Sequence, residues 1–280
     1  MRHLKRTVPI PNMTNLKFST GVSSWAVHDD LGAPPISGVE SGAVIPDFKN
    51  SNAAISLLEL PAELAKRGFD CLQICHFHLP TRDAAYLDEL RASIESSGLQ
   101  LHALLADDGD LTHPENGARD ENWIADWLPI AAKLGAKNAR VIAGKTKGED
   151  ALQRSAAALK RLAAQGESQG VSIITENWFD LLDSPAAVHE ILGQTEGKIG
   201  FLLDFGNWNG EDKHEKLAQI APLANSCHAK AEFLESGALD ETDFARSLRL
   251  PYSPEFRGPF VLVNGGLNGI GKLRDFIGQI

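Results

Sequence analysis

Two apolar segments of the sequence each end in a carboxylate that is followed by an asparagine and a tryptophan. The segment VSIITENWF at 171–179 carries Glu176, and IGFLLDFGNW at 199–208 carries Asp204. A carboxylate at the buried end of an apolar strand is costly unless a partner neutralises its charge. The repeated pattern therefore indicates that both side chains bind something positive.

Other polar side chains also stand at or near the ends of apolar runs. They are His76, His78, Asp107, Asp108, His228, Lys230 and Asn264. Two carboxylates, an imidazole and an amide oxygen that met at one edge would suit Mn²⁺, Mg²⁺ or Co²⁺. A structural zinc site is less consistent with this set of side chains, because such a site usually contains cysteine or several histidines. We predict a divalent metal held by Glu176, Asp204, His228 and Asn264, although each residue alone would also fit a capping or core role.

The elements that must position these residues follow from periodicity. Eight apolar runs alternate with eight segments of helical spacing, and several helical segments close on glycine. The runs are 16–27, 69–79, 99–106, 138–143, 171–179, 198–208, 226–233 and 260–264. The helical segments are 53–68, 83–98, 121–135, 149–170, 184–193, 214–224, 242–250 and 273–280.

This alternation predicts an α/β fold, a (β/α)8 TIM barrel, for which a chain of 280 residues is long enough. The competing fold is a doubly wound open sheet, which is disfavoured because no glycine-rich phosphate fingerprint opens the first helix. We expect a flexible arm at 1–14 and one barrel at 15–280. The Pro-, Gly- and Ser-containing loop at 28–52 is interpreted as a lid or as a surface insertion.

Composition narrows the class of partner. The formal charge of −10 and the isoelectric point near 5.4 disfavour nucleic-acid binding, so a small molecule is the expected partner. No stretch approaches the roughly 18 apolar residues that a membrane span needs, and we expect no membrane contact. Three cysteines are too few for a disulfide framework, which favours a cytoplasmic location.

Three motifs on successive strands, TENWF, LLDFGNW and CHAKAEF, resemble the sugar phosphate isomerase/epimerase family, whose xylose isomerase-like barrel belongs to the AP endonuclease superfamily. The resemblance implies that Glu176, Asp204 and His228 bind metal and that Lys230 faces the substrate. The family's fourth ligand is normally a glutamate ending the eighth strand, and here Asn264 is assigned to that position. An asparagine can lend an oxygen but cannot act as a base. Trp178 stands where many members have histidine.

We therefore expect an isomerase or epimerase acting on a ketose or sugar acid through a metal-stabilised enediolate. Glu176, Lys230 and His78 are the catalytic candidates. His76, Asp108, Trp25, Trp178 and Asn207 are assigned to substrate binding. The absence of the second glutamate favours an alternative, a lyase or decarboxylase of an oxo-sugar acid. A non-catalytic sugar-binding barrel is a further alternative, an endonuclease fits less well, and a homo-oligomer is among the expected assemblies.

Overall fold

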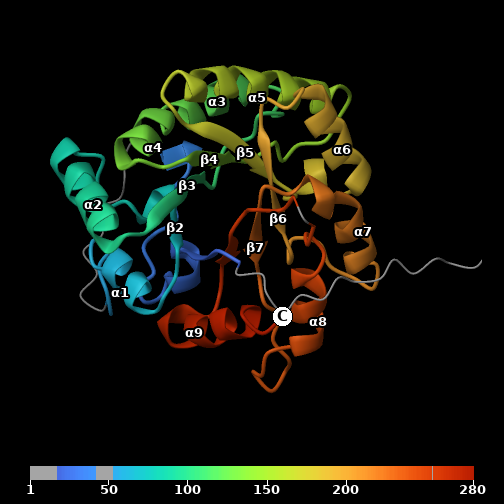
Figure 1. The fold of residues 1–280 in the computed structure, drawn as a ribbon. Helices are drawn as coiled ribbons and strands as arrows, with labels where there is room; N and C mark the ends of the chain where they lie inside the picture. The colour runs from blue at the N-terminus through green and yellow to red at the C-terminus, as the bar shows by residue number, and fades with distance from the viewer. Residues whose placement is uncertain (1–17, 42–52, 254) are drawn as a thin grey trace, which may run out of the picture.

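Eight parallel strands close into a barrel in the computed structural model, which describes residues 18–41, 53–253 and 255–280 (Figure 1). Each strand pairs with its neighbour in sequence, and the first pairs with the eighth. The strands are β1 Thr20–Ser23, β2 Cys71–Cys75, β3 Gln100–Ala106, β4 Asn138–Val141, β5 Ser172–Glu176, β6 Gly200–Asp204, β7 Ser226–Ala229 and β8 Phe260–Leu262. The predicted (β/α)8 barrel is confirmed, and the open sheet is wrong. The predicted arm at 1–14 lies outside the described residues.

The α-helices form a ring around the barrel (Figure 1). Those of the described residues are α1 Leu60–Lys66, α2 Ala84–Ser97, α3 Gly117–Ala125, α4 Leu128–Leu134, α5 Ala151–Glu167, α6 Pro185–Gln194, α7 Lys213–Ile220, α8 Glu241–Leu248 and α9 Gly266–Ile277. The single helix expected at 121–135 is in fact two helices. Proline lacks the N–H that an interior helix position needs, and Pro129 lies in the first turn of α4, where that N–H is dispensable.

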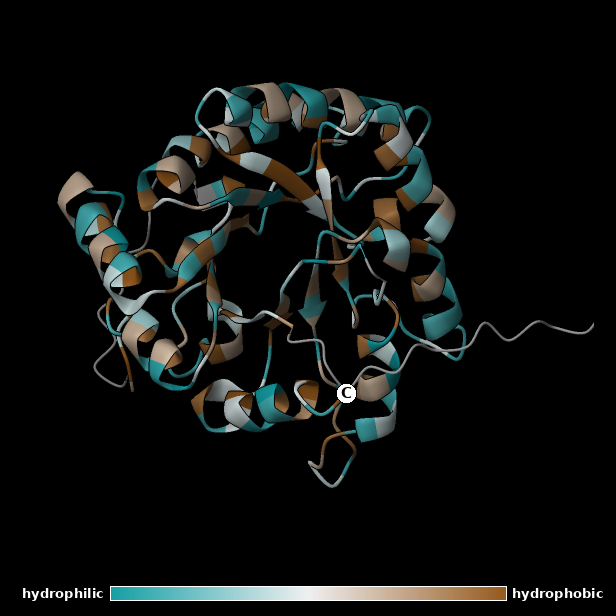
Figure 2. Ribbon diagram, in the orientation of Figure 1, coloured by the Kyte–Doolittle hydropathy of each residue, from teal (hydrophilic) through white to brown (hydrophobic). Residues whose placement is uncertain are grey.

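Apolar side chains occupy both faces of the strands. The outward side chains pack with those of the helices in one large buried cluster. Hydrophobic residues, brown in Figure 2, recur in both the strands and the surrounding helices. A second buried cluster fills the inside of the barrel and includes Leu105, Ile174 and Leu202. Because successive strand residues point to opposite faces, Glu176 shares the interior face with Ile174, and Asp204 shares it with Leu202. The apolar interior thus ends in carboxylates at the carboxyl end of the strands.

The described part of the loop after β1 is tied to the ends of β2 and β3. The Val39 backbone N–H donates to Asp108 Oδ2 at 2.7 Å, and His76 Nε2 lies 2.8 Å from the carbonyl oxygen of Ser37. A Cβ on Gly38 would collide with the Asp108 carboxylate, which explains the glycine at this close approach. Residues 42–52 of the predicted lid lie outside the described residues, and the lid interpretation stays a prediction.

Asp110 joins the loop after β3 to the loop after β4. Its Oδ1 accepts from the backbone N–H of Lys145 at 2.8 Å and from the hydroxyl of Thr112 at 2.7 Å, and its Oδ2 accepts from the hydroxyl of Thr146 at 2.5 Å. Burial raises the pKa of Asp110, but these hydrogen bonds outweigh burial and lower the pKa to about 2. The clamp therefore requires the ionised carboxylate.

We expect the Asp110 clamp to make stability fall in acid. A carboxyl whose pKa is lower in the folded state stabilises that state above its unfolded pKa near 4, and this contribution, roughly 2 kcal/mol here, disappears as the pH falls towards 2. Urea unfolding of Asp110→Asn should show lower stability at pH 7 and a shallower loss of stability below pH 4. Asp180→Asn, at an exposed aspartate, is the control. Parallel acid profiles for the native and Asp110→Asn proteins would contradict the assignment.

No helix in the described ranges is long and apolar enough to cross a bilayer.

Candidate metal centre and active site

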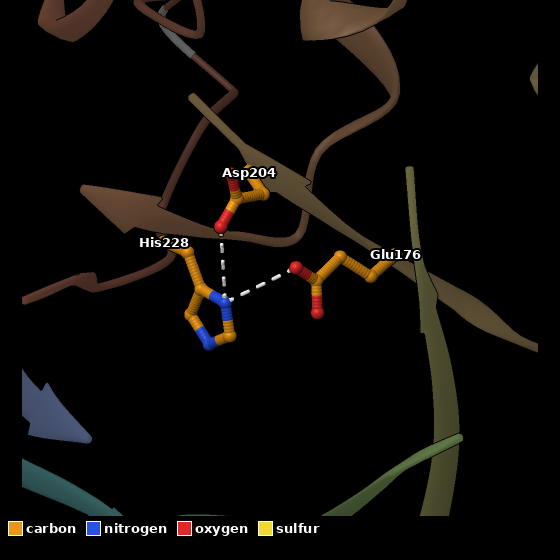
Figure 3. Close-up of side chains that lie close together, drawn as sticks. All are labelled: Glu176, Asp204 and His228. Atoms are coloured by element: carbon orange, nitrogen blue, oxygen red, sulfur yellow. Dashed lines mark ion pairs between the residues drawn. The ribbon is translucent and has the colours of Figure 1, made fainter. Parts of the chain in front are cut away.

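Glu176, Asp204 and His228 meet at the carboxyl end of three adjacent strands (Figure 3). One ligand atom from each lies within 4.8 Å of the others. His228 Nδ1 is 3.4 Å from Glu176 Oε1 and 3.5 Å from Asp204 Oδ2, and the other ring nitrogen points away from both carboxylates. The side chains are at most 5% exposed. This is the group of residues that the sequence predicted as the centre of a metal site.

Asparagines position both acidic residues. The Asn177 side chain accepts from the backbone N–H of Asp204 at 2.8 Å and donates to the carbonyl oxygen of Asp204 at 3.1 Å, so it fastens the end of β5 to β6. Asn207 donates to Glu176 Oε1 at 2.7 Å. The Gly206 backbone N–H donates to Asp204 Oδ1 at 2.6 Å. The repeated carboxylate and asparagine pattern thus reflects reciprocal positioning across two strands.

The charges of these side chains shift one another's pKa values. Burial lowers the pKa of His228, but the charge of Glu176 and a hydrogen bond to Asp204 outweigh burial and raise the pKa to about 9. Burial raises the pKa of Glu176, but the positive charges of His228 and Arg140 outweigh it and lower the pKa to about 2. Without a metal, the protonated imidazole therefore occupies the place of a cation between two carboxylates.

Arg140 of β4 is a site residue that the sequence reasoning missed. Its guanidinium is 2% exposed, donates to Asp107 Oδ1, and places Nε 3.3 Å from Glu176 Oε2. It also lies 5.1 Å from the ring of Trp178. Its position inside the apolar run at 138–143 could have indicated this role, because a buried arginine needs an anionic partner.

The donor set fits a divalent cation. Two carboxylates and a neutral imidazole are ligands that Mg²⁺, Mn²⁺ and Co²⁺ accept. Glu176 Oε2 is buried without a hydrogen-bond partner, as are Arg140 Nε and Nη1 and Asp107 Oδ2. Unpartnered buried polar atoms are costly and are expected where a ligand completes the site. These residues can therefore hold a metal and contact the molecule beside it.

Asn264 does not join the three residues. Its amide donates to the carbonyl oxygen of Ala231 at 2.6 Å and accepts from the Ala231 backbone N–H at 3.2 Å. The pairing register explains this orientation. Val261 of β8 is paired with the inward-facing His228, so alternation turns Val263 into the barrel and Asn264 away from it. Val263, and not the predicted ligand Asn264, therefore lines the cavity at the end of β8.

A cavity of about 370 Å³ lies above the three residues. Of the predicted substrate-binding residues, Trp25, Trp178 and Asn207 line it, and so does the predicted catalytic Lys230. No described residue forms a hydrogen bond or ion pair with Lys230 Nζ. The remaining lining includes Asp107, Ile36, Phe77, Leu105, Phe179 and Val263. One side of the cavity is thus ionic, and the side at the ends of β8, β1 and β2 is apolar apart from Ser23.

His76, His78 and Asp108 do not line this cavity. Strand β2 ends at Cys75, and a 3-10 helix at His76–His78 turns Phe77 towards the cavity instead. His78 Nδ1 lies 2.6 Å from the Ser24 hydroxyl, and burial lowers the pKa of His78 to about 3. His76 and Asp108 hold the loop after β1. These side chains therefore hold the described part of the segment after β1 in place at the carboxyl end of the barrel.

A closed parallel barrel whose polar side chains gather at the carboxyl ends of its strands has the architecture of TIM-barrel enzymes. The model of the xylose isomerase-like TIM barrel family matches residues 61–248. The chain belongs to this family. No curated protein matches the sequence.

Solved structures share the fold at low sequence identity. An L-ribulose 3-epimerase is 17% identical with a TM-score of 0.65, covering 94% of this chain and 87% of its own. A xylose isomerase-like TIM barrel protein from Mycobacterium smegmatis in complex with magnesium is 14% identical with a TM-score of 0.63, covering 94% and 96%. The 3-keto-D-glucoside 4-epimerase of E. coli is 16% identical with a TM-score of 0.60, covering 94% and 98%.

Proposed function

We propose that the protein is a divalent-metal-dependent isomerase or epimerase of a ketose or sugar-acid derivative. The observation that carries the proposal is the convergence of Glu176, Asp204 and His228 below a cavity, with Glu176 Oε2 buried and without a hydrogen bond. The family match and the epimerases of similar fold support the same class of reaction. The predictions of a cytoplasmic location and a homo-oligomer stay predictions.

The metal would be held by Glu176, Asp204 and His228. When bound, it would draw electron density from a substrate carbonyl and a neighbouring hydroxyl. Glu176 Oε1 faces His228 and is held by Asn207, whereas Oε2 has no hydrogen-bond partner. We assign to Oε2 the removal of the proton on the carbon next to the carbonyl. The adjacent Arg140 keeps this oxygen ionised, and its Nη1, which has no hydrogen bond, can stabilise negative charge that develops on the substrate.

A second group must deliver a proton to the substrate. Val263, the residue after the eighth strand, lines the cavity there and cannot do so. Lys230, the residue after the seventh strand, lines the cavity and has three N–H donors, so we assign it this role. Trp25 and Trp178 would bind the apolar faces of the substrate, and Asn207 would contact it while holding Glu176.

A lyase or decarboxylase of an oxo-sugar acid is the second candidate, and Val263 is the observation that favours it. An epimerase needs proton-active groups on both faces of one carbon, whereas a lyase needs one general acid or base at the bond that breaks. With Val263 at the end of the eighth strand, the acidic and basic side chains that line the cavity lie on the arc from Asp107 through Glu176 to Lys230. The same arc would serve loss of water or carbon dioxide.

The test incubates magnesium-loaded protein in D₂O with a panel of ketoses and oxo-sugar acids and follows the products by NMR. The isomerase proposal predicts deuterium on the carbon next to the carbonyl, in a product of otherwise unchanged mass. Loss of water or carbon dioxide would instead identify the lyase. A protein that binds Mg²⁺ and sugars without exchange would be a non-catalytic sugar-binding barrel, and one that binds no divalent metal would overturn the metal-dependent proposal.

A further inference from the structure

A buried hydrogen-bonded chain runs from the metal-site histidine deeper into the barrel. His228 Nε2, the ring nitrogen that points away from the carboxylates, lies 2.8 Å from Gln73 Oε1. Gln73 Nε2 lies 3.0 Å from His102 Nδ1. Gln73 is 0% exposed and His102 is 9% exposed. Three side chains from β7, β2 and β3 are thus linked inside the barrel.

The fold makes a specific adjustment to bring His102 into this chain. On β3, Ala103 and Leu105 face the barrel interior, so regular alternation would turn His102 outwards. The pairing of β2 with β3 shifts by one residue here, because Leu72 pairs with Leu101 whereas Gln73 pairs with Ala103. His102 is the extra residue of this bulge. Bulges commonly redirect a side chain, and this one directs His102 to Gln73.

The donor and acceptor in each of these hydrogen bonds can be assigned by starting from His228. A histidine that binds metal through Nδ1 must carry its proton on Nε2. That N–H needs an acceptor, and Gln73 Oε1 is the atom beside it. The Gln73 amide must then direct its NH₂ group to His102 Nδ1, which accepts. If the amide were reversed, it would present a donor to His228 and favour the proton on Nδ1, where the metal must bind.

We propose that Gln73 and His102 are positioning residues that hold His228 in the tautomer able to bind the catalytic metal. Gln73 accepts the Nε2 proton of His228, and His102 prevents the Gln73 amide from reversing. This inference rests on the proposed metal site. It assigns a role in metal affinity to His102, which lines a separate polar hollow at the opposite end of the barrel with Lys137, Asn138 and Arg257.

The test compares four variants of the full chain. Gln73→Met keeps the side-chain length but removes the amide, and Gln73→Glu keeps an acceptor for His228. His102→Leu removes the acceptor for the Gln73 amide, and His102→Asn returns an amide oxygen near the position of Nδ1. Ser155→Ala is the control, because it removes a different buried hydrogen bond, from the Ser155 hydroxyl to the Ala143 carbonyl oxygen at 2.5 Å.

Two readouts are used, and neither requires turnover. Calorimetric titration with Mn²⁺ should show about 10- to 100-fold weaker binding for Gln73→Met, the range typical of lost partners behind metal-binding histidines. Binding by His102→Leu should also weaken, while Gln73→Glu and His102→Asn should bind more tightly than Gln73→Met and His102→Leu, respectively. Ser155→Ala should bind like the native chain. Long-range ¹H–¹⁵N spectra of ¹⁵N-histidine protein with Mg²⁺ report which nitrogen of His228 is protonated, and the metal-free spectra report the hydrogen bond at Nε2 of the doubly protonated ring.

The outcomes separate this inference from the function it rests on. Native-like Mn²⁺ affinity and unchanged His228 signals in Gln73→Met would overturn it, as would equal loss of affinity in His102→Leu and His102→Asn. If the native chain bound no metal, the proposed function would fail. The metal-free spectra, in which both ring nitrogens carry a proton, would then still show whether Gln73 accepts the hydrogen bond from His228 Nε2. Circular dichroism and thermal melting establish that each variant is folded.

Discussion

Glu176→Gln is expected to leave the barrel folded and to lower kcat by about 10³-fold, within the range that proton transfer by a positioned side chain contributes. The change keeps the length and shape of the side chain, so the amide oxygen can still accept from Asn207, while Arg140 loses the carboxylate oxygen that it faces. It removes the base, because an amide cannot accept the substrate proton. It also removes one negative charge facing the metal position, so metal affinity should fall as well.

The kinetics of Glu176→Gln should be measured at saturating Mg²⁺, so that the loss of the base is separated from weaker metal binding. Solvent deuterium exchange into the substrate, followed by NMR, reports proton removal directly and should fall in parallel with kcat. Glu211→Gln, at an exposed glutamate, serves as the matched control and should behave like the native protein. Turnover and exchange within tenfold of native would exclude Glu176 as the base.

Asp204→Ala is expected to remove metal binding and activity together. Asp204 contributes one of the three converging ligand atoms and one of the two carboxylates facing His228. Removing residues that hydrogen-bond to a metal ligand typically lowers metal affinity 10- to 100-fold. Removing Asp204, a direct ligand, should therefore lower the affinity for Mn²⁺ by at least about a hundredfold. The backbone clamp should remain, since Asn177 bonds the N–H and carbonyl oxygen of residue 204 and not its side chain.

Calorimetric titration with Mn²⁺ and activity at increasing metal concentration would test Asp204→Ala. Melting temperatures of the metal-free proteins should show that the variant is folded. Adding Mn²⁺ should raise the melting temperature of the native chain but not that of the variant, since a ligand stabilises only the state that binds it. Asp180→Ala, at an exposed aspartate, is the control. A fully active variant that binds no metal would remove Asp204, and metal dependence, from the proposal.

The sequence could predict residues whose placement depends only on local alternation. Glu176 and Asp204 end regular strands, and each lies two residues after an apolar side chain that faces the interior. Parallel strands bring their carboxyl ends to one edge, so the convergence of these residues with His228 follows from the strands alone. The same reasoning did not place His76 and His78 correctly, because they do not line the cavity. Their run becomes a 3-10 helix after Cys75, and the period of two no longer applies.

The sequence by itself determined the barrel, because alternating apolar and helical segments can bury their faces only against one another. It also determined which residues meet at the centre of the site. Tertiary structure decided the rest. Register turned Val263 inwards and Asn264 to Ala231, a bulge brought His102 to Gln73, and the closed barrel placed Arg140 between Asp107 and Glu176. The reason is physical: each of these contacts joins residues from different strands, and their meeting depends on how the strands are paired.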